Sequence, residues 1–280
     1  MNTLNFEIKS IDNIINASDL TKEGSLVEQI YSILRKKIIN LSLLSETPLV
    51  EKEIAAIFEI SKTPVREALI RLANDELVKI MPQSGSFVAP ISLERYFEAC
   101  FIRGKLEGGC VARLAEKGIT LSEQVQLQSI ITKQEQLLKE ISIAESEHDN
   151  ARLIEINETF HRSLFEYLGL LGAWRLLDNS KAAMSRVKHL KRLLGIKHKE
   201  TVIEEHTRIV EAIIKRDPKA AEAAMIKHIG DVDTEMAIIS QNPQFIQSMN
   251  EFNMLVNEQR NRQNASKYNA KRFVSKRMVF

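Results

Sequence analysis

The sequence predicts a mainly α-helical protein, with a small β-hairpin in its first third and an antiparallel helical bundle after it. Three observations favour this fold class. Glycine and proline are scarce, at 10 and 6 of 280 residues, so few positions interrupt helices. Short amphipathic segments at 50–58 and 61–78 precede two strand-like runs that flank a glycine-containing turn. From residue 92 to about 240, helical segments are separated only by short turn signals.

The first part of the chain is expected to hold an arm and two helices. Residues 1–24 are polar and mixed and predict an N-terminal arm. The segment from Ser25 to Asn40 has apolar residues at helical spacing and predicts an amphipathic helix. The segment 50–58 predicts a second, shorter helix. Only two residues separate it from a third helix, which Ser61 can cap by accepting backbone N–H hydrogen bonds.

The third helix carries polar and basic residues at its leading end. Its apolar residues fall at helical spacing on one side, and Lys62, Thr63 and Arg66 point outward. Strand-like runs at 77–80 and 86–88 follow. Two steeply crossing helices and a strand–turn–strand predict a winged helix-turn-helix, which inserts its second helix into the DNA major groove.

Residues 25–90 resemble the DNA-binding domain of the GntR family of bacterial transcription regulators. The run T-P-V-R-E-A-L at 63–69, followed by R-L and then by L-V before a Gly-tipped hairpin, carries the resemblance. It implies that the chain binds double-stranded operator DNA through six positions, Lys52, Ser61, Lys62, Thr63, Arg66 and Gly85. For Arg66 the alternative is an i,i+4 pair on the helix surface.

The sequence also departs from this family. Larger residues replace glycines that are usual there, at Leu41, Glu46, Glu59 and Glu76. Glycine adopts positive φ without a Cβ penalty, so we expect backbone strain at these positions. Lys52 and Lys62 stand where arginine is common, and lysine lacks the planar fork that grips guanine. Ser84 takes a wing position where the family often has arginine, so the operator sequence does not follow from the resemblance.

Charge alone does not identify a nucleic-acid-binding protein here. The net charge is +2, and residues 25–90 hold eight basic and eight acidic residues. The DNA-binding prediction therefore depends on where the charges lie and not on their sum.

The second part of the chain predicts six helices, at about 92–117, 121–146, 150–168, 172–194, 199–216 and 218–239. One interpretation is a bundle that only dimerises. Histidine placement suggests a second. His161 follows Asn157 by one helical turn, and His206 and His228 fall on apolar helix faces. Each histidine alone is more simply a core residue, but together the four side chains predict an interior metal site, because imidazole suits Zn²⁺ and Ni²⁺.

Residues 96–240 resemble the FCD domain, the all-helical ligand-binding domain of the FadR subfamily of GntR regulators. The pattern (Asp/Asn)-x-x-x-His, then His before x-x-I, then a final His before Ile, falls on Asn157, His161, His206 and His228. The resemblance implies a divalent metal ion, zinc or nickel, and a small carboxylate effector. Asparagine replaces the commoner aspartate at Asn157, so the site has one negative charge fewer. Arg103 matches a position that is often basic, where it would pair with the effector carboxylate; a helix-internal pair with Glu107 is the alternative.

Other features carry less information. Gly104, Gly108 and Gly109 within one predicted helix suggest close packing or a bend. Two cysteines ten residues apart in a helical pattern favour free thiols, as in a reducing cytoplasm. No apolar run approaches the length of a membrane span. Residues 241–280 predict a further helix at 244–262 and a basic tail from Arg260, either solvated or in contact with phosphate.

Together these features predict a cytoplasmic bacterial transcription regulator, not an enzyme, that binds a palindromic operator as a homodimer. Two alternatives are a DNA-binding protein with a purely dimerising bundle and a metal-dependent enzyme. No carboxylate is placed by motif as a general base beside the histidines, which weighs against the enzyme. The predicted domains are an arm at 1–24, a winged helix-turn-helix at 25–90, an effector-binding and dimerisation bundle at 91–240 and an extension at 241–280.

Overall fold

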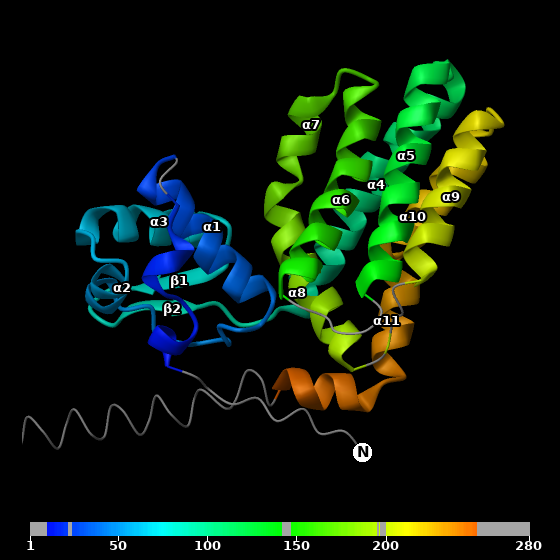
Figure 1. Ribbon diagram of the computed structural model, residues 1–280. Coiled ribbons are helices and arrows are strands. Elements are labelled where there is room, and N and C mark those ends of the chain that lie inside the picture. Colours follow the sequence, from blue (N-terminus) through cyan, green and yellow to red (C-terminus); the bar gives the residue numbers. More distant parts are fainter. Residues whose placement is uncertain (1–9, 22–23, 142–146, 195, 197–199, 251–280) are drawn as a thin grey trace, which may run out of the picture. The chain divides into compact units, whose positions relative to one another are not determined.

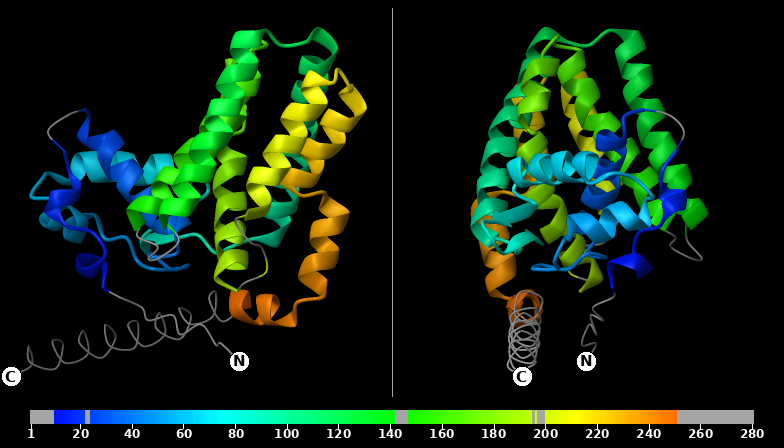
Figure 2. Two further views of the ribbon diagram at one scale, coloured as in Figure 1. Left: turned by 45° about the vertical axis from the view of Figure 1, so that its right-hand side comes forward. Right: turned by 90° about the vertical axis from the view of Figure 1, so that its left-hand side faces the viewer.

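The computed structural model describes residues 10–21, 24–141, 147–194, 196 and 200–250. The described residues form two compact units. The first contains residues up to Ser92, with 185–194 and 239–250; the second contains 93–184, 196 and 200–238. Figures 1 and 2 show the elements of each unit from three directions.

The first unit contains the predicted helices and hairpin. Its elements are η1 (Ile11–Asn13), η2 (Ala17–Asp19), α1 (Leu26–Ile39), α2 (Glu51–Ile57), α3 (Lys62–Asn74), β1 (Val78–Met81) and β2 (Gly85–Val88). The two strands pair antiparallel, with Val78 opposite Val88 and Met81 opposite Gly85. This is the expected winged helix-turn-helix, a mainly helical fold with a two-stranded wing (Figure 1).

Burial of one face of each helix holds this unit together. Apolar side chains from α1 and α3 that are at most 1% exposed form much of its core, among them Ile30, Leu34, Ile38, Leu69 and Leu72. A polar contact adds to this packing, because the Tyr31 hydroxyl of α1 donates to Asp75 beyond α3 at 2.5 Å. Burial and this hydrogen bond raise the pKa of Tyr31 to about 12, so the phenol stays protonated and keeps its role as donor.

The expected strain at the replaced glycines is present. The φ angles are 61° at Leu41, 62° at Glu46, 57° at Glu59 and 59° at Glu76. The turns of the unit therefore keep the left-handed conformation that glycine would adopt at lower cost.

One local expectation was wrong. Ser61 is the N-cap residue of α3, with extended backbone, but its side chain makes no capping hydrogen bond. Ser61 is instead an exposed residue. The start of α3 therefore rests on the backbone and on Pro64 in its first turn, where no N–H donor is needed.

The C-terminal half of α8 (Asp178–Leu193) packs within the first unit. Arg186 is 3% exposed and donates hydrogen bonds to the Ala89 carbonyl at 2.8 Å and to the Ser45 hydroxyl at 3.3 Å. Burial lowers the pKa of Arg186 to about 10, which still leaves the guanidinium charged near neutral pH.

The second unit is all-helical. With α8 it comprises α4 (Leu93–Lys117), α5 (Leu121–Glu140), α6 (Glu147–Glu166), α7 (Leu171–Leu176), α9 (Glu200–Ile214), α10 (Pro218–Ile229) and most of α11 (Val232–Ser240). The caps explain several of the boundaries. Thr120 and Glu123 form a capping box at the start of α5, and Asp217 caps α10 with Pro218 in its first turn.

Two helices that we expected to be continuous are broken. The segment 172–194 divides at Leu177 into α7 and α8, and the segment 218–239 divides into α10 and α11. At the second break Gly230 has φ +112°, and Asp231 accepts a hydrogen bond from the Thr234 backbone N–H at 3.2 Å. A glycine that ends one helix and an aspartate that caps the next are a local stop and start, which the apolar periodicity masks.

Helix α4 packs against α10, α9 and α6. A Cβ added at Gly108 would lie 3.3 Å from Glu222 Cγ, and one at Gly104 would lie 4.0 Å from Ile226 Cγ1. Close packing on α10, one of the two alternatives weighed above, therefore accounts for these two glycines. Gly109 has no neighbour within 4 Å of such a Cβ.

The remaining expectations concern thiols, membranes and termini. Neither Cys100 nor Cys110 forms a disulfide, and both are buried. No described helix combines the length and apolarity needed to cross a bilayer. Residues 243–250 are helical with Phe245 buried, whereas the rest of the helix expected at 244–262, and the basic tail, lie outside the described residues.

Candidate nucleic-acid interface and metal centre

The first turn of α2, the leading end of α3 and the tip of the wing present the six positions expected to contact DNA. All six are exposed: Lys52, Ser61, Lys62, Thr63, Arg66 and Gly85. The opposite side of α3 is buried through Val65, Ala68, Leu69 and Leu72. The amphipathic division of α3 thus fixes the helix by its apolar face and leaves its polar end accessible, as DNA recognition requires.

Arg66 has a partner that the sequence did not suggest. Its guanidinium makes a two-pronged contact with Glu51 at the start of α2, with Nε–Oε1 at 3.0 Å and Nη2–Oε2 at 2.9 Å. The alternative of an i,i+4 pair within α3 was therefore wrong. The hydrogen bond from Arg66 lowers the pKa of Glu51, which keeps the carboxylate ionised and the guanidinium oriented.

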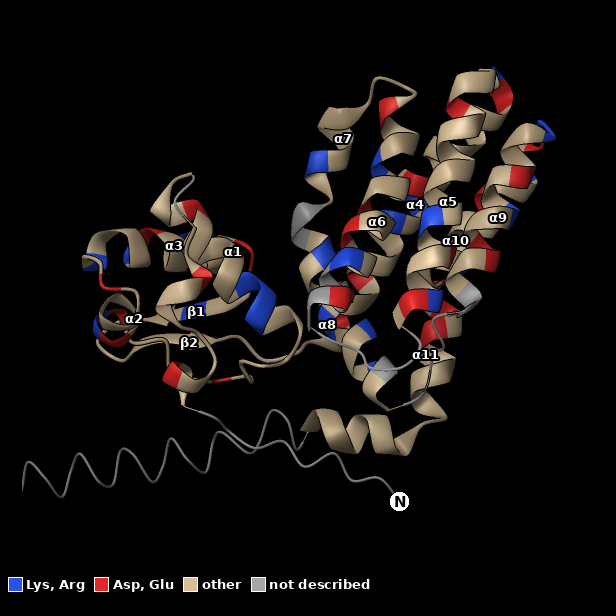
Figure 3. Ribbon diagram, viewed as in Figure 1, with Lys and Arg blue, Asp and Glu red and all other residues tan. Residues whose placement is uncertain are grey.

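Acidic and basic residues lie close together on this unit. Figure 3 shows acidic and basic positions on the helices of both units, and α2 and α3 each carry residues of both signs. The expected contacts to bases or phosphates would therefore come from individually placed side chains such as Lys62 and Arg66, in line with the composition.

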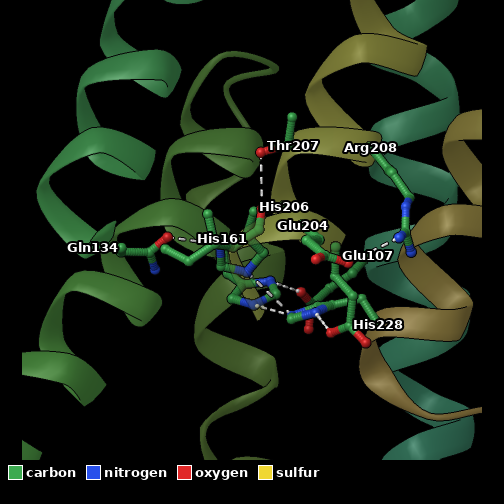
Figure 4. Close-up of polar contacts among 10 residues, drawn as sticks. Glu107, Gln134, His161, Glu204, His206, Thr207, Arg208 and His228 are labelled. Carbon is green, nitrogen blue, oxygen red and sulfur yellow. Dashed lines mark hydrogen bonds and ion pairs between the residues drawn. The ribbon is translucent and has the colours of Figure 1, made fainter. Parts of the chain in front are cut away.

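Three histidines meet inside the helical unit, as predicted. His161 of α6, His206 of α9 and His228 of α10 are 1%, 0% and 4% exposed. The Nε2 atom of His228 lies 3.3 Å from that of His206 and 3.1 Å from that of His161. Figure 4 shows the three imidazoles turned toward one another. Phe160 stacks on His206 with ring centroids 3.8 Å apart, which fixes that ring from the side.

The other ring nitrogen of each histidine faces an oxygen. The Nδ1 atom of His206 lies 2.9 Å from Gln134 Oε1 on α5. That of His228 lies 2.8 Å from Glu205 Oε2 on α9, and that of His161 lies 2.5 Å from Glu107 Oε2 on α4. Carboxylate and carbonyl oxygens only accept hydrogen bonds, so these neighbours favour the proton at Nδ1.

This arrangement defines the tautomers and so the chemistry of the cluster. A neutral imidazole protonated at Nδ1 has a lone pair at Nε2, and Nε2 is the atom that each of the three histidines directs at its neighbours. Metal-binding histidines in proteins are held in this way by acceptors on their second nitrogen. Two ligands about 2.1 Å from a tetrahedral zinc ion stand roughly 3.4 Å apart, close to the two Nε2 separations observed. The donor set and its spacing therefore fit a divalent ion.

Glu107 connects this cluster to Arg103. Its Oε1 lies 2.5 Å from Arg103 Nε while its Oε2 faces His161. Burial alone would raise the pKa of the Glu107 carboxyl, but Arg103 and His161 outweigh it and lower that pKa to about 2. The carboxylate is thus ionised over the physiological range. The helix-internal pair of Arg103 with Glu107, weighed above as the alternative, is therefore present. Arg103 also donates to Met184 Sδ at 3.1 Å, and its side chain is buried.

None of the cluster contacts given above involves Asn157 or the remaining histidines. Asn157 is half-buried on α6, four residues before His161, and so lies on the same face of that helix. Among the histidines outside the cluster, His189 is half-buried on α8. The side chain of His148, and all of His198, lie outside the described part.

Four functional candidates were missed from the sequence: Glu51, Gln134, Glu205 and the second contact of Glu107. Glu205 directly precedes His206 in an E-E-H run, yet it contacts His228 and not His206. All four contacts join groups that are distant in sequence, so periodicity within one helix does not reveal them.

The fold and the exposed recognition helix define a winged helix-turn-helix DNA-binding protein joined to an all-helical domain with a histidine cluster. The first unit matches the bacterial regulatory proteins of the gntR family over residues 26–88, and the FCD domain matches residues 97–231. The chain belongs to the GntR family of bacterial transcription regulators and carries an FCD domain, a kind of effector-binding domain.

Individual relatives agree with this assignment. The chain is 35% identical over 214 residues to the HTH-type transcriptional repressor RspR of Escherichia coli K12, covering 76% of this chain and 90% of the relative. It is 26% identical to the Uxu operon transcriptional regulator of the same organism, and the match covers 65% of this chain and 75% of the relative. These relatives are regulators and not enzymes. Among solved structures, E. coli McbR/YncC has a TM-score of 0.60 and 22% sequence identity; the match covers 79% of this chain and 99% of that chain. A GntR regulator from Rhodococcus has a TM-score of 0.59 and 20% identity, and the match covers 78% of this chain and 99% of that chain.

Proposed function

We propose that this regulator binds a palindromic operator as a homodimer in the bacterial cytoplasm, and that a metal ion and a small carboxylate effector in the FCD domain control that binding. The observation that carries the proposal is the cluster of three buried histidines, each with Nδ1 held by an oxygen and Nε2 directed at its neighbours. A bundle that served only for dimerisation would have no need of three converging imidazoles in its interior.

The DNA-binding part of the proposal rests on α3 and the wing. Lys62, Thr63 and Arg66 approach base edges and phosphates from the leading end of the helix, while Lys52, Ser61 and Gly85 flank it. The exposed Ser61 hydroxyl, which makes no cap, is available for phosphate. Glu51 acts as a positioning residue, since its two-pronged contact fixes the plane of the Arg66 guanidinium before DNA arrives.

In the FCD domain, His161, His206 and His228 would hold the ion, with Asn157 as the fourth protein ligand. A bound Zn²⁺ or Ni²⁺ would supply a positive charge that attracts a carboxylate. Arg103, joined to the same cluster through Glu107, would take part in recognising that carboxylate. Glu107, Gln134 and Glu205 hold the imidazoles in the metal-binding tautomer. Effector binding would alter operator affinity by favouring one arrangement of the dimer.

Elemental analysis of purified protein tests the metal site. Wild-type protein should carry about one zinc or nickel ion per chain, and His206→Ala should carry almost none. His189→Ala is the matched control, because it removes a half-buried histidine outside the cluster. A wild-type protein without metal, and with melting unchanged by a chelator, would contradict the metal-dependent part and favour a purely dimerising bundle.

Selection of operator sequences from random DNA tests the homodimer and the control by a carboxylate effector. The selected sites should be inverted repeats, and a panel of small carboxylates should shift affinity for them. Non-palindromic sites would overturn the homodimer, and indifference to every carboxylate together with a metal-free protein would overturn effector control.

A further inference from the structure

Arg186 is a buried charge in the first unit. Its side chain, on the C-terminal half of α8, is 3% exposed. Burial lowers the pKa of the guanidinium, and no described Asp or Glu lies close enough to oppose that effect. The buried Arg103, in contrast, is paired with Glu107. A buried charge is costly unless an opposite charge accompanies it, so the surroundings of Arg186 favour a negatively charged partner.

The hydrogen bonds of Arg186 use only part of its guanidinium. Nη1 donates to the Ala89 carbonyl at 2.8 Å and to the Pro90 carbonyl at 3.4 Å. Nη2 donates to Ser45 Oγ at 3.3 Å, which is long for such a bond. Nε is buried and has no hydrogen-bond partner among the described residues. All three partners are neutral oxygens, so they solvate the charge in part and do not balance it.

The Nε–H of Arg186 and the neighbouring Nη2 form one edge of the planar guanidinium. Arg66 of the same chain shows what this edge binds, because its Nε and Nη2 donate to the two carboxylate oxygens of Glu51 at 3.0 and 2.9 Å. Carboxylate and phosphate groups present two oxygens at the spacing of this fork. The Nε edge of Arg186 is therefore suited to an oxyanion.

Two features beside this edge also favour an anion. Ser45 lies in the loop between α1 and α2 and is 0% exposed. Its Oγ accepts from Arg186, so the hydroxyl proton is left to donate to a further acceptor. The segment 185–194 reads S-R-V-K-H-L-K-R-L-L, with four basic side chains and no acidic one. An anion on the Nε edge would thus meet a second donor and a positive local field.

We propose that Arg186 and Ser45 form an anion site inside the DNA-binding unit, which takes one small oxyanion, a phosphate or a carboxylate group, on the Nε edge. The inference does not rest on the metal, effector or homodimer proposed above, since both residues belong to the first unit. The anion balances the charge of Arg186 in the folded unit, so its binding stabilises that unit as its concentration rises. It also strengthens the attachment of α8 to Ser45 and to the Ala89–Pro90 segment after β2.

Isothermal titration calorimetry of the full chain with inorganic phosphate, and separately with acetate, tests the site at constant ionic strength in chloride. At least one of the two anions should bind the wild-type protein at a site that depends on Arg186. Arg186→Lys keeps the charge and loses the fork, so the dissociation constant should rise by about tenfold or more. Ser45→Ala removes one donor and should raise it by about threefold or more.

Two control variants separate this site from the others on the chain. Arg66→Lys makes the same chemical change at an exposed arginine of the expected DNA surface, where phosphate could also bind. His206→Ala removes a candidate metal ligand, since a bound metal ion could hold either anion. Both variants should leave the dissociation constant unchanged, because neither residue contributes a donor to the Nε edge of Arg186.

The outcomes identify the ligand or overturn the site. Binding of phosphate alone that Arg186→Lys weakens identifies a phosphate group, and binding of acetate alone identifies a carboxylate; binding of both supports the oxyanion chemistry that they share. If Arg186→Lys does not fold, Ser45→Ala decides, because it removes one hydroxyl and no charge. A wild-type protein that binds neither anion, or binds one with an affinity that Arg186→Lys and Ser45→Ala leave unchanged, overturns the anion site, and water then satisfies the Nε–H.

Discussion

Replacing Glu59 by glycine should stabilise the DNA-binding unit. Glu59 lies in the turn between α2 and α3 with φ 57°, and its side chain is exposed. A non-glycine residue in this conformation costs roughly 1–2 kcal/mol. Glycine relieves that strain but loses more backbone entropy on folding, roughly 0.5–1 kcal/mol. The net gain in the free energy of unfolding should be about 0.5–1 kcal/mol.

Calorimetry and amide hydrogen exchange measure this gain. The transition of a unit of this size should move up by about 2–6 °C. Exchange of the amides of α2 and α3 should slow in parallel, since their opening depends on the stability of the same unit. The backbone bond from Ile60 N–H to the Ala55 carbonyl, 3.0 Å long, should persist because no side chain takes part in it.

Two further variants separate strain from other effects. Glu59→Gln keeps the strain and removes the charge, so it should match wild type. Leu41→Gly relieves strain at φ 61° but deletes a side chain that is only 6% exposed. Loss of that burial costs about 2–4 kcal/mol, so this variant should be less stable than wild type. If Glu59→Gly proves no more stable than Glu59→Gln, the strain argument is refuted.

Four other predictions concern the two sites. Arg66→Ala should weaken operator binding by about tenfold to a hundredfold per half-site without changing the melting temperature. Arg208→Ala, the control, should change neither the affinity nor the melting temperature. An anisotropy titration that shows unchanged affinity for Arg66→Ala would contradict the assignment of α3 as the recognition helix. Zinc at about a hundred times its dissociation constant should stabilise wild-type protein by about 2.7 kcal/mol, or about 5–10 °C, and His206→Ala should abolish this shift in a thermal melt. Asn157→Asp should tighten metal binding in a competition titration, because it adds a negative charge; weaker binding would place Asn157 outside the ligand set. The ionised Glu107 carboxylate contributes stability that is fully present above its ordinary pKa of 4.5 and is lost as pH falls toward about 2. The urea midpoints of wild type and Glu107→Gln should therefore converge as pH falls through that window. A constant difference between the two midpoints would contradict the lowered pKa.

Much of the fold was predictable because its signals are local. The helix pair and wing follow from period-3.6 and period-2 apolar patterns around a short turn. Positive φ at Glu59 follows from a glycine position in a recognised turn, and the structure confirms it. The breaks at Leu177 and Gly230 were missed because apolar residues keep their helical spacing across both, and that spacing does not record one irregular residue.

The candidate metal centre shows where sequence patterns stop. Three histidines on apolar faces of three helices can be expected to meet, because each face must turn inward to be buried. Glu107 is different. Four residues after Arg103, it reads as one half of an ordinary pair along α4, and that pair is present. Its second oxygen faces His161 of α6, a contact that exists only once α4 and α6 have packed. One buried carboxylate therefore joins the residue expected to recognise the effector to a residue expected to hold the metal, and this link belongs to the tertiary structure and not to the spacing within either helix.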